Sequence, residues 1–509
     1  LSVNNQQQTT NKAFGGLKPL IRRLHFYAGV FIGPFILVAA LSGAAYAVAP
    51  TLENVVYGDI IKVQPSSQTV TLQSQIDNAR AAYPDMEVSQ VWPATKADDS
   101  TRVLLVDESL GEERLRSVFV NPGDGKVIGD EPSYSGLGEM PLRRFISEMH
   151  ESMFLGTPGE MYSELAASWL WFVALGGLVL WWSRVGGRKI FTGLKNPTKK
   201  HQLDVALDGE ETPESTHVAA KRQSLWNGQG KSRNWHVKLH GVAGTWLLVV
   251  MLGLSATGIT WSAFAGANVS STVDAIQGEP KNIETSLNGE EVASTGGHNH
   301  AQHGGMLTDH EGQPLTAEEL SGQAQRVLDT ARDQGLTGPL RLYQPEDNQH
   351  AWQASERWVP WRTTSDAVSV NGETGDVVDT LPFSQLPLFS KLTSWGIYLH
   401  MGIMFGLPLQ ILLFVCALGI AGLVVFGYIA WWKRRPTRNG VAGLPGPNQP
   451  LSVVEWVIVG VLLATVGVFL PLFGISLAVM IVVDRVLARW AAKQASPRFT
   501  QKMTVPAGT

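Results

Sequence analysis

The chain repeats itself, and the repeats carry histidines at matching positions. One set of residues recurs 250 positions later: Val118, Asn121, Gly125, Val127, His150, Gly156, Pro158, Gly177, Trp181, Trp182 and Arg184 match Val368, Asn371, Gly375, Val377, His400, Gly406, Pro408, Gly427, Trp431, Trp432 and Arg434. A second set recurs 215 positions later: Leu24, His25, Gly29 and Gly43 match Leu239, His240, Gly244 and Gly258. The chain is therefore a tandem duplication of one unit, which we predict to be a helix, an outer domain and a second helix.

The apolar residues gather in long runs that are almost free of charge. They lie near 26–49, 164–183, 241–263, 402–432 and 452–484. Each run reaches the roughly 20 residues that a helix needs to cross about 30 Å of hydrocarbon. Pro471 and Gly474 break the last run, which therefore reads as two helices with a tight turn. The sequence predicts a polytopic membrane protein with six spans.

The basic residues predict the orientation of these spans. Lys and Arg flank the start of the first and third spans and the ends of the second, fourth and sixth, among them Arg22, Arg184, Lys238, Lys433 and Arg485. Because such residues favour the cytoplasmic side, both termini are expected to be cytoplasmic and the two long segments between spans to lie outside. The formal net charge is −4, and no nucleic acid partner is expected.

The fold class predicted is an all-α polytopic membrane bundle of two pseudo-symmetric repeats and a C-terminal helical hairpin, with two α+β outer domains. The cytoplasmic segments are placed at 1–20, 185–235, 436–451 and 491–509. The spans are placed at 21–49, 149–184, 236–263 and 396–435, with the hairpin at 452–490. The outer domains occupy 50–148 and 264–395.

Each outer domain is expected to be a helix covering an antiparallel sheet. In the first, 70–83 reads as the helix, and 87–93, 102–107, 115–120 and 126–128 read as strands. In the second, 315–334 reads as the helix, and 340–343, 351–354, 368–370 and 376–378 as strands. The evidence is alternation of apolar and polar residues, with Asn-to-Gly turns closing the last two strands. The two domains are expected to close over a shared cleft.

Each repeat places one histidine near each membrane face. His25 and His240 begin the first and third spans on the cytoplasmic side, whereas His150 and His400 lie near the outer ends of the second and fourth. Ionisable groups within membrane segments are costly and usually functional. Haem iron takes axial imidazoles that face each other from different helices. The repeat therefore predicts that His25 pairs with His240, that His150 pairs with His400, and that each pair binds haem iron.

The cysteine and glycine residues restrict which cofactor the four histidines could bind. The one cysteine, Cys416, excludes an internal disulfide, a Cys-ligated iron–sulfur cluster and covalent c-type haem, so two non-covalent b-type haems are expected. Gly29 and Gly244 lie one helical turn beyond His25 and His240, where a missing side chain leaves room for a flat macrocycle. Packing of helices through small residues is the alternative interpretation of these glycines.

A separate histidine cluster lies in the loop 297–310 of the second outer segment. It contains His298, His300 and His303. Imidazoles at this density can bind copper, nickel or zinc, and the alternative is a polar insert with no defined ion.

The motifs around the repeated histidines resemble those of PepSY-associated transmembrane proteins. The stretch from Leu239 to Trp246 is similar to that family's L-H-x-x-x-G-x-W opening, and those at Met149–Gly156 and Leu399–Gly402 to its LHxxLFLG and LHxG entries. Met149 and Met153 replace leucines of the pattern. The resemblance covers roughly residues 20–435 and implies PepSY-like outer domains. Family members include bacterial inner-membrane reductases that release iron from siderophores with b-type haems.

Two functions are therefore expected as alternatives. The first is a di-haem oxidoreductase in the bacterial cytoplasmic membrane that reduces an outer ferric siderophore or other metal chelate, copper included. No flavin or nicotinamide fingerprint is present, so the donor would be a quinol or a separate flavin reductase. Trp358, Trp361, Arg357 and Arg362 are the candidate substrate contacts. The second is a membrane-anchored PepSY binding or regulatory module without redox activity.

Overall fold

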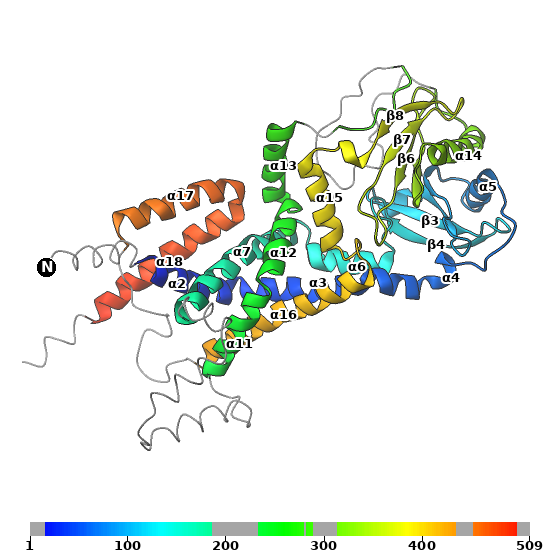
Figure 1. Cartoon of the computed structure of the whole chain (residues 1–509). Coiled ribbons are helices and arrows are strands. Elements are labelled where there is room, and N and C mark those ends of the chain that lie inside the picture. The colour runs from blue at the N-terminus through cyan, green and yellow to red at the C-terminus, as the bar shows by residue number, and fades with distance from the viewer. Residues whose placement is uncertain (1–15, 186–232, 279–280, 289–312, 434–450, 496–509) are drawn as a thin grey trace, which may run out of the picture. The chain divides into compact units, whose positions relative to one another are not determined.

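The computed structural model describes residues 16–185, 233–278, 281–288, 313–433 and 451–495. The chain divides into two compact units, and each takes segments from both repeats. The first, which we call the helical unit, comprises Leu1–Leu41, Glu160–Gly266 and Cys416–Thr509. The second, which we call the sheet unit, comprises Ser42–Gly159 and Ala267–Val415. The elements of both units are labelled in Figure 1.

The helical unit is built from long apolar helices. Those lying wholly or partly in it are α2 (Leu17–Phe31), α3 (Gly33–Val56), α7 (Thr157–Val185), α11 (Arg233–Trp246), α12 (Leu248–Thr260), α13 (Ala263–Gln277), α16 (Leu407–Trp432), α17 (Val453–Phe469) and α18 (Pro471–Ala495). One core cluster joins them, and Trp169 of α7 and Phe473 of α18 are its largest buried side chains.

Two of the predicted spans are interrupted. α2 ends at Phe31 and α3 begins at Gly33, because Pro34 lacks the N–H that a continuous helix would need at that point. α11 and α12 meet at Leu247 with a bend of 63°. The histidines His25 and His240 lie on the parts before these breaks, on α2 and α11.

The candidate membrane spans are fewer than the six predicted. In the described residues, α3, α7 and α16 are each long and apolar enough to cross a membrane, and the bent pair α11–α12 adds a fourth if it forms one span. α17 is apolar but only 17 residues long, and α18 carries Asp484, Arg485 and Arg489 in its second half. Several candidate spans remain, so the chain is a multi-pass membrane protein.

The sheet unit holds one eight-stranded antiparallel sheet, in the order β4-β3-β2-β1-β5-β6-β7-β8. Its strands are β1 (Val88–Trp92), β2 (Thr101–Val106), β3 (Arg114–Val120), β4 (Val127–Tyr134), β5 (Leu340–Tyr343), β6 (Trp352–Glu356), β7 (Ala367–Val370) and β8 (Val377–Leu381). Helices α5 (Leu72–Ala82) and α14 (Ala317–Asp333) contribute Ile76 and Val327 to a core that also takes buried residues from both halves of the sheet. Figure 1 shows both helices beside the strands.

The expectation of two separate outer domains is therefore wrong. The predicted helices and strands all form, but the two four-stranded sheets join through β1 and β5, where Gln90 pairs with Tyr343 and Val91 with Leu342. The physical reason is that an edge strand presents unpaired N–H and C=O groups, which the pairing of β1 with β5 satisfies. The boundary between the repeats is thus a paired ladder of strands, which we call the seam, and not the cleft that the sequence suggested.

Short helices that the sequence did not predict carry two of the histidines. α6 (Pro141–Glu151) holds His150, and α15 (Leu388–His400) ends at His400. Each is separated from the following long helix by a turn in which Gly156 and Gly406 have positive φ values of 59° and 58°. The long helices α7 and α16 then begin with Pro158 and Pro408 in their first turn, where a proline needs no backbone donor. Besides these, α4 (Gly58–Ile61) is a single turn.

Candidate functional site: two histidine pairs

The helical unit brings His25 and His240 together. Their ring centres are 6.3 Å apart, and the ring planes cross at 83°. Nδ1 of His240 lies 3.0 Å from the carbonyl oxygen of Leu423 on α16. That contact assigns Nδ1 as a donor and makes Nε2 the nitrogen that would bind a metal. Nδ1 of His25 is buried and has no hydrogen-bond partner among the described residues.

Glycines of the neighbouring helices make room for these two rings. A Cβ at Gly177 of α7 would lie 3.2 Å from Cε1 of His25, and a Cβ at Gly427 of α16 would lie 3.7 Å from Cε1 of His240. Gly177 and Gly427 are equivalent positions of the 250-residue repeat. The sequence showed that they recur, but only the structure shows that each lies against a histidine.

Gly29 and Gly244, the glycines proposed from the sequence, border less crowded space. A Cβ at Gly29 would meet nothing within 4 Å, and a Cβ at Gly244 would meet only the methyl groups of Leu423, at 4.0 Å. Open space one turn from a histidine is what a flat ligand would need. The assignment of these glycines to a cofactor stays a prediction.

The sheet unit brings His150 and His400 together in the same way. Their ring centres are also 6.3 Å apart, with an interplanar angle of 59°. Nδ1 of His150 lies 2.9 Å from Oγ of Ser42 on α3. A Cβ at Gly43, the next residue of α3, would lie 3.1 Å from Cε1 of His150. Again a glycine accommodates the ring while a neighbouring oxygen occupies Nδ1.

A buried ionic network fixes the helix that carries His150. Arg143 of α6 pairs with Glu139 at 3.2 Å and with Glu53 of α3 at 3.7 Å. Tyr46 of α3 donates to Glu139 at 2.6 Å and accepts from Arg143 at 3.0 Å. All four residues are buried, and each charge has a partner, so the network holds α6 against α3 in one arrangement.

The spacing within each pair suits one metal ion between the rings. An imidazole nitrogen lies about 2 Å from a bound first-row metal and the ring centre roughly 1 Å further back, so two rings on opposite sides of one ion have centres about 6 Å apart. Both observed distances are 6.3 Å. In the described part of the chain no group of three or more His, Cys, Asp or Glu side chains is arranged to hold an ion. Each pair therefore offers two neighbouring imidazoles, and among the described residues no complete set of metal ligands surrounds either pair.

The other candidate residues have different outcomes. His298, His300 and His303 lie outside the described residues. Arg362 forms an ion pair with Glu356. Trp358 is stacked on Tyr398, two residues before His400, with ring centres 4.4 Å apart.

The remaining two substrate candidates also differ from each other. Trp361 is 70% exposed and has a positive φ of 70°. Its backbone N–H donates to the Met404 carbonyl at 2.7 Å. Arg357 packs on the ring of Trp92, with its guanidinium carbon 4.0 Å from the ring centre.

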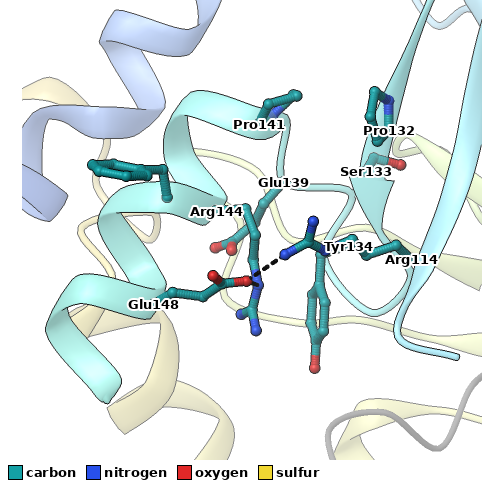
Figure 2. Close-up of a pocket in the computed structure, with 9 residues that line it drawn as sticks. Arg114, Pro132, Ser133, Tyr134, Glu139, Pro141, Arg144 and Glu148 are labelled. Atoms are coloured by element: carbon teal, nitrogen blue, oxygen red, sulfur yellow. Dashed lines mark hydrogen bonds and ion pairs between the residues drawn. The ribbon is translucent and has the colours of Figure 1, made fainter. Parts of the chain in front are cut away.

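Figure 2 shows a pocket of about 260 Å³ beside α6. Glu148 accepts hydrogen bonds from Arg114 at 2.6 Å and Arg144 at 3.0 Å, drawn as dashed lines. Arg144 also lies over the ring of Tyr134, at 4.7 Å from its centre. The arginines in this pocket are thus neutralised by carboxylates of the pocket itself.

The C-terminal hairpin α17–α18 holds the helix that carries His25. Oε1 of Glu455 accepts hydrogen bonds from the backbone N–H groups of Gly16 and Leu17, at the start of α2. Asp484 of α18 accepts from Nε of Arg23 at 2.6 Å and from the hydroxyl of Tyr27 at 3.0 Å. Arg23 and Tyr27 flank His25 in sequence, so the hairpin anchors α2 on both sides of the candidate ligand.

Comparisons with known proteins agree with this architecture at the level of the family. No curated protein matches the chain. The model of the PepSY-associated TM region matches residues 22–434, which include all four paired histidines and end before the hairpin. The chain belongs to the PepSY-associated TM region family.

Proposed function

We propose that the chain is a di-haem b oxidoreductase that passes electrons across the cytoplasmic membrane to an extracytoplasmic ferric complex. The observation that carries the proposal is the pair of matching sites, each with two imidazoles 6.3 Å apart on repeat-related positions. Two opposed ligands are too few for a structural zinc or copper ion, which takes three or four protein ligands. They suffice for haem, because the macrocycle supplies the remaining donors.

The residues around each pair support haem binding. His25, His240, His150 and His400 would hold iron, and glycines lie against the rings of the first three. Ser42 and the Leu423 carbonyl would fix the orientation of His150 and His240. When bound, a haem held by two imidazoles would supply one-electron transfer without binding substrate at its iron. The acceptor would therefore be reduced at a haem edge.

The direction of electron flow follows from the predicted topology. The His25–His240 pair would lie on the cytoplasmic side and receive electrons from a quinol or a separate flavin reductase. The His150–His400 pair belongs to the same compact unit as the sheet, so it would deliver electrons to a ferric siderophore or other chelate outside. The two haems would therefore carry electrons between a donor and an acceptor that lie on opposite sides of the lipid bilayer.

The test uses sealed vesicles with the protein in one orientation and the haems reduced by a quinol. A ferric siderophore too large to cross the bilayer should reoxidise the haems when added to the side of the sheet unit, and the gallium complex of the same siderophore should not. Reoxidation only from the cytoplasmic side would refute the proposed direction. Reoxidation by a copper(II) chelate and by no ferric chelate would make the protein a copper reductase. A protein that binds no haem would favour the regulatory alternative.

A further inference from the structure

Three arginines converge on one tryptophan at the seam of the sheet. Trp92 of β1 is paired in register with Arg102 of β2. On its other side lies Arg341 of β5, because Val91 pairs with Leu342 in the antiparallel ladder. Arg357 directly follows β6. The guanidinium carbons of Arg102, Arg341 and Arg357 are 4.8, 4.7 and 4.0 Å from the centre of the Trp92 ring.

These three positive charges have no carboxylate partner within the described part of the chain. Among the described residues, none of the three arginines forms an ion pair, in contrast to Arg362 nearby, which pairs with Glu356. The carboxylates that act on the arginines at longer range are engaged elsewhere. Glu53 pairs with Arg143, and Asp99 pairs with Lys62 at 2.7 Å.

Their hydrogen-bonding capacity is also largely unused. Arg102 donates to the Gly138 carbonyl at 2.9 Å, and Arg341 donates to the carbonyl of Gly136 and, at 3.4 Å, to the hydroxyl of Tyr343. Nε of Arg341 is buried and has no hydrogen-bond partner in the described part of the chain. The guanidinium of Arg357 makes no hydrogen bond to any described residue, and the residue is half-buried. A guanidinium has five N–H donors, and most of those in this cluster remain for a ligand.

Burial and mutual repulsion make the cluster unfavourable without an anion. Burial lowers the pKa of Arg357 well below its usual range, and the neighbouring charges of Arg341 and Arg102 lower it further. Burial also lowers the pKa of Arg102 to about 10. Arginine otherwise stays charged at any pH of interest, so the lowered pKa values indicate that the site disfavours the charges of Arg102 and Arg357.

We propose that Arg102, Arg341 and Arg357, on the Trp92 ring, form a carboxylate-binding site. Guanidinium groups match the planar geometry of carboxylates and bind them through two parallel hydrogen bonds. Three such groups without counter-charges suit a ligand that carries several carboxylates. The site exists only because the two halves of the sheet join, since Arg102 comes from the first repeat and Arg341 and Arg357 from the second.

The site is connected to the His150–His400 pair within the sheet unit. Gly136 and Gly138, which accept from Arg341 and Arg102, lead directly into α6 and His150. Trp358, next to Arg357, stacks on Tyr398, two residues before His400. The carboxylates could therefore belong to a soluble ferric chelate or to the propionates of a haem held by this pair. The assignment of either ligand, the ferric chelate or the haem propionates, rests on the proposed function. The ability of the site to bind a free polycarboxylate does not.

Gallium(III) citrate tests whether the ligand is a soluble ferric chelate, because gallium(III) resembles ferric iron and is not reduced. Calorimetric titration of the purified protein should show binding that Arg341→Gln and Arg357→Gln each weaken roughly 10- to 100-fold, the usual effect of removing a charged hydrogen-bond donor. Arg80→Gln is the matched control, since Arg80 lies on α5, which packs on the opposite face of the sheet. Affinity for a neutral gallium trihydroxamate should be the same in all variants.

If the site instead binds the propionates of a haem, we expect a different result. Gallium citrate would not bind, and Arg341→Gln would instead speed the loss of one haem to a haem-scavenging protein and lower that haem's reduction potential. Arg80→Gln would change neither. If gallium citrate binding and haem retention both matched those of the unsubstituted protein, the carboxylate site would be refuted. Citrate binding to a protein that holds no haem would keep this site and overturn the proposed function.

Thermal stability separates a binding site from a structural cluster. If the arginines form an anion-binding site, the ligand-free Arg357→Gln protein should be at least as stable as the unsubstituted protein, because the substitution removes one uncompensated charge. If the arginines serve only to pack on Trp92, Arg357→Gln should lower the melting temperature and citrate should have no effect. That result would also overturn the proposal.

Discussion

Replacing His150 or His400 with alanine should leave a protein that holds one haem in place of two. The lost haem would be the one bound in the sheet unit, and His25→Ala or His240→Ala should remove the other. Each variant would take away one of the two proposed ligands of a haem, whose rings lie 6.3 Å apart. Haem content per chain, measured with the reduced-minus-oxidised spectrum, checks the result. Loss of both haems from a variant that still folds would show that the pairing is wrong.

Glycine variants test the same site without touching a ligand. Gly43→Val should weaken the haem at the His150–His400 pair, because even a Cβ at this position would lie 3.1 Å from the His150 ring. Gly177→Val should act in the same way on the His25 side, where the corresponding distance is 3.2 Å. Gly253→Val is the matched control, since a Cβ there would meet nothing within 4 Å. Equal haem loss in all three variants would mean that the effect is not local.

Asp484→Asn should destabilise the protein by about 3–5 kcal/mol, the usual cost of removing one partner of a buried ion pair. Asp484 and Arg23 have side-chain exposures of only 2% and 3%, and Nε of Arg23 lies 2.6 Å from Oδ1 of Asp484. The substitution should also loosen the proposed haem at His25, because α2 loses an ionic contact with the hairpin. Thermal unfolding and the rate of haem loss are the two measurements.

The double variant Arg23→Leu, Asp484→Leu should recover much of the lost stability, since it removes both members of the buried pair and leaves neither of them unpaired. Asp77→Asn is the control, because Asp77 is solvent-exposed and its 3.8 Å contact with Arg80 should contribute little. An Asp484→Asn protein that melts at the same temperature as the Asp77→Asn control would show that the hairpin does not anchor α2.

Local structure could be predicted well from the sequence because it depends on nearby residues. All eight strands and the helices α5 and α14 were expected from alternation and turn residues, and Gly125 and Gly375 adopt the positive φ angles that the two turns require. The histidine partners could be predicted because the repeat relates them. The turns before α7 and α16 also have a signal in the sequence, namely Gly156 and Pro158 with their counterparts Gly406 and Pro408, although the apolar pattern predicts an uninterrupted span at each place.

Contacts between distant segments could not be predicted in this way. The alternation in Val88–Trp92 marks a strand but does not say whether one or both of its edges are paired, so the joining of β1 to β5 had no signal. Arg102 and Arg341 come together only through that joining. The buried pair of Arg23 and Asp484 likewise depends on how α18 packs against α2.

The most direct test of the two-haem proposal is the haem and iron content of the purified, unsubstituted protein. The proposal predicts two non-covalent b-type haems per chain, with a reduced α-band typical of b haem and the low-spin signals expected when two imidazoles bind each iron. A colourless protein, one haem per chain, or high-spin iron with an open coordination position would contradict it.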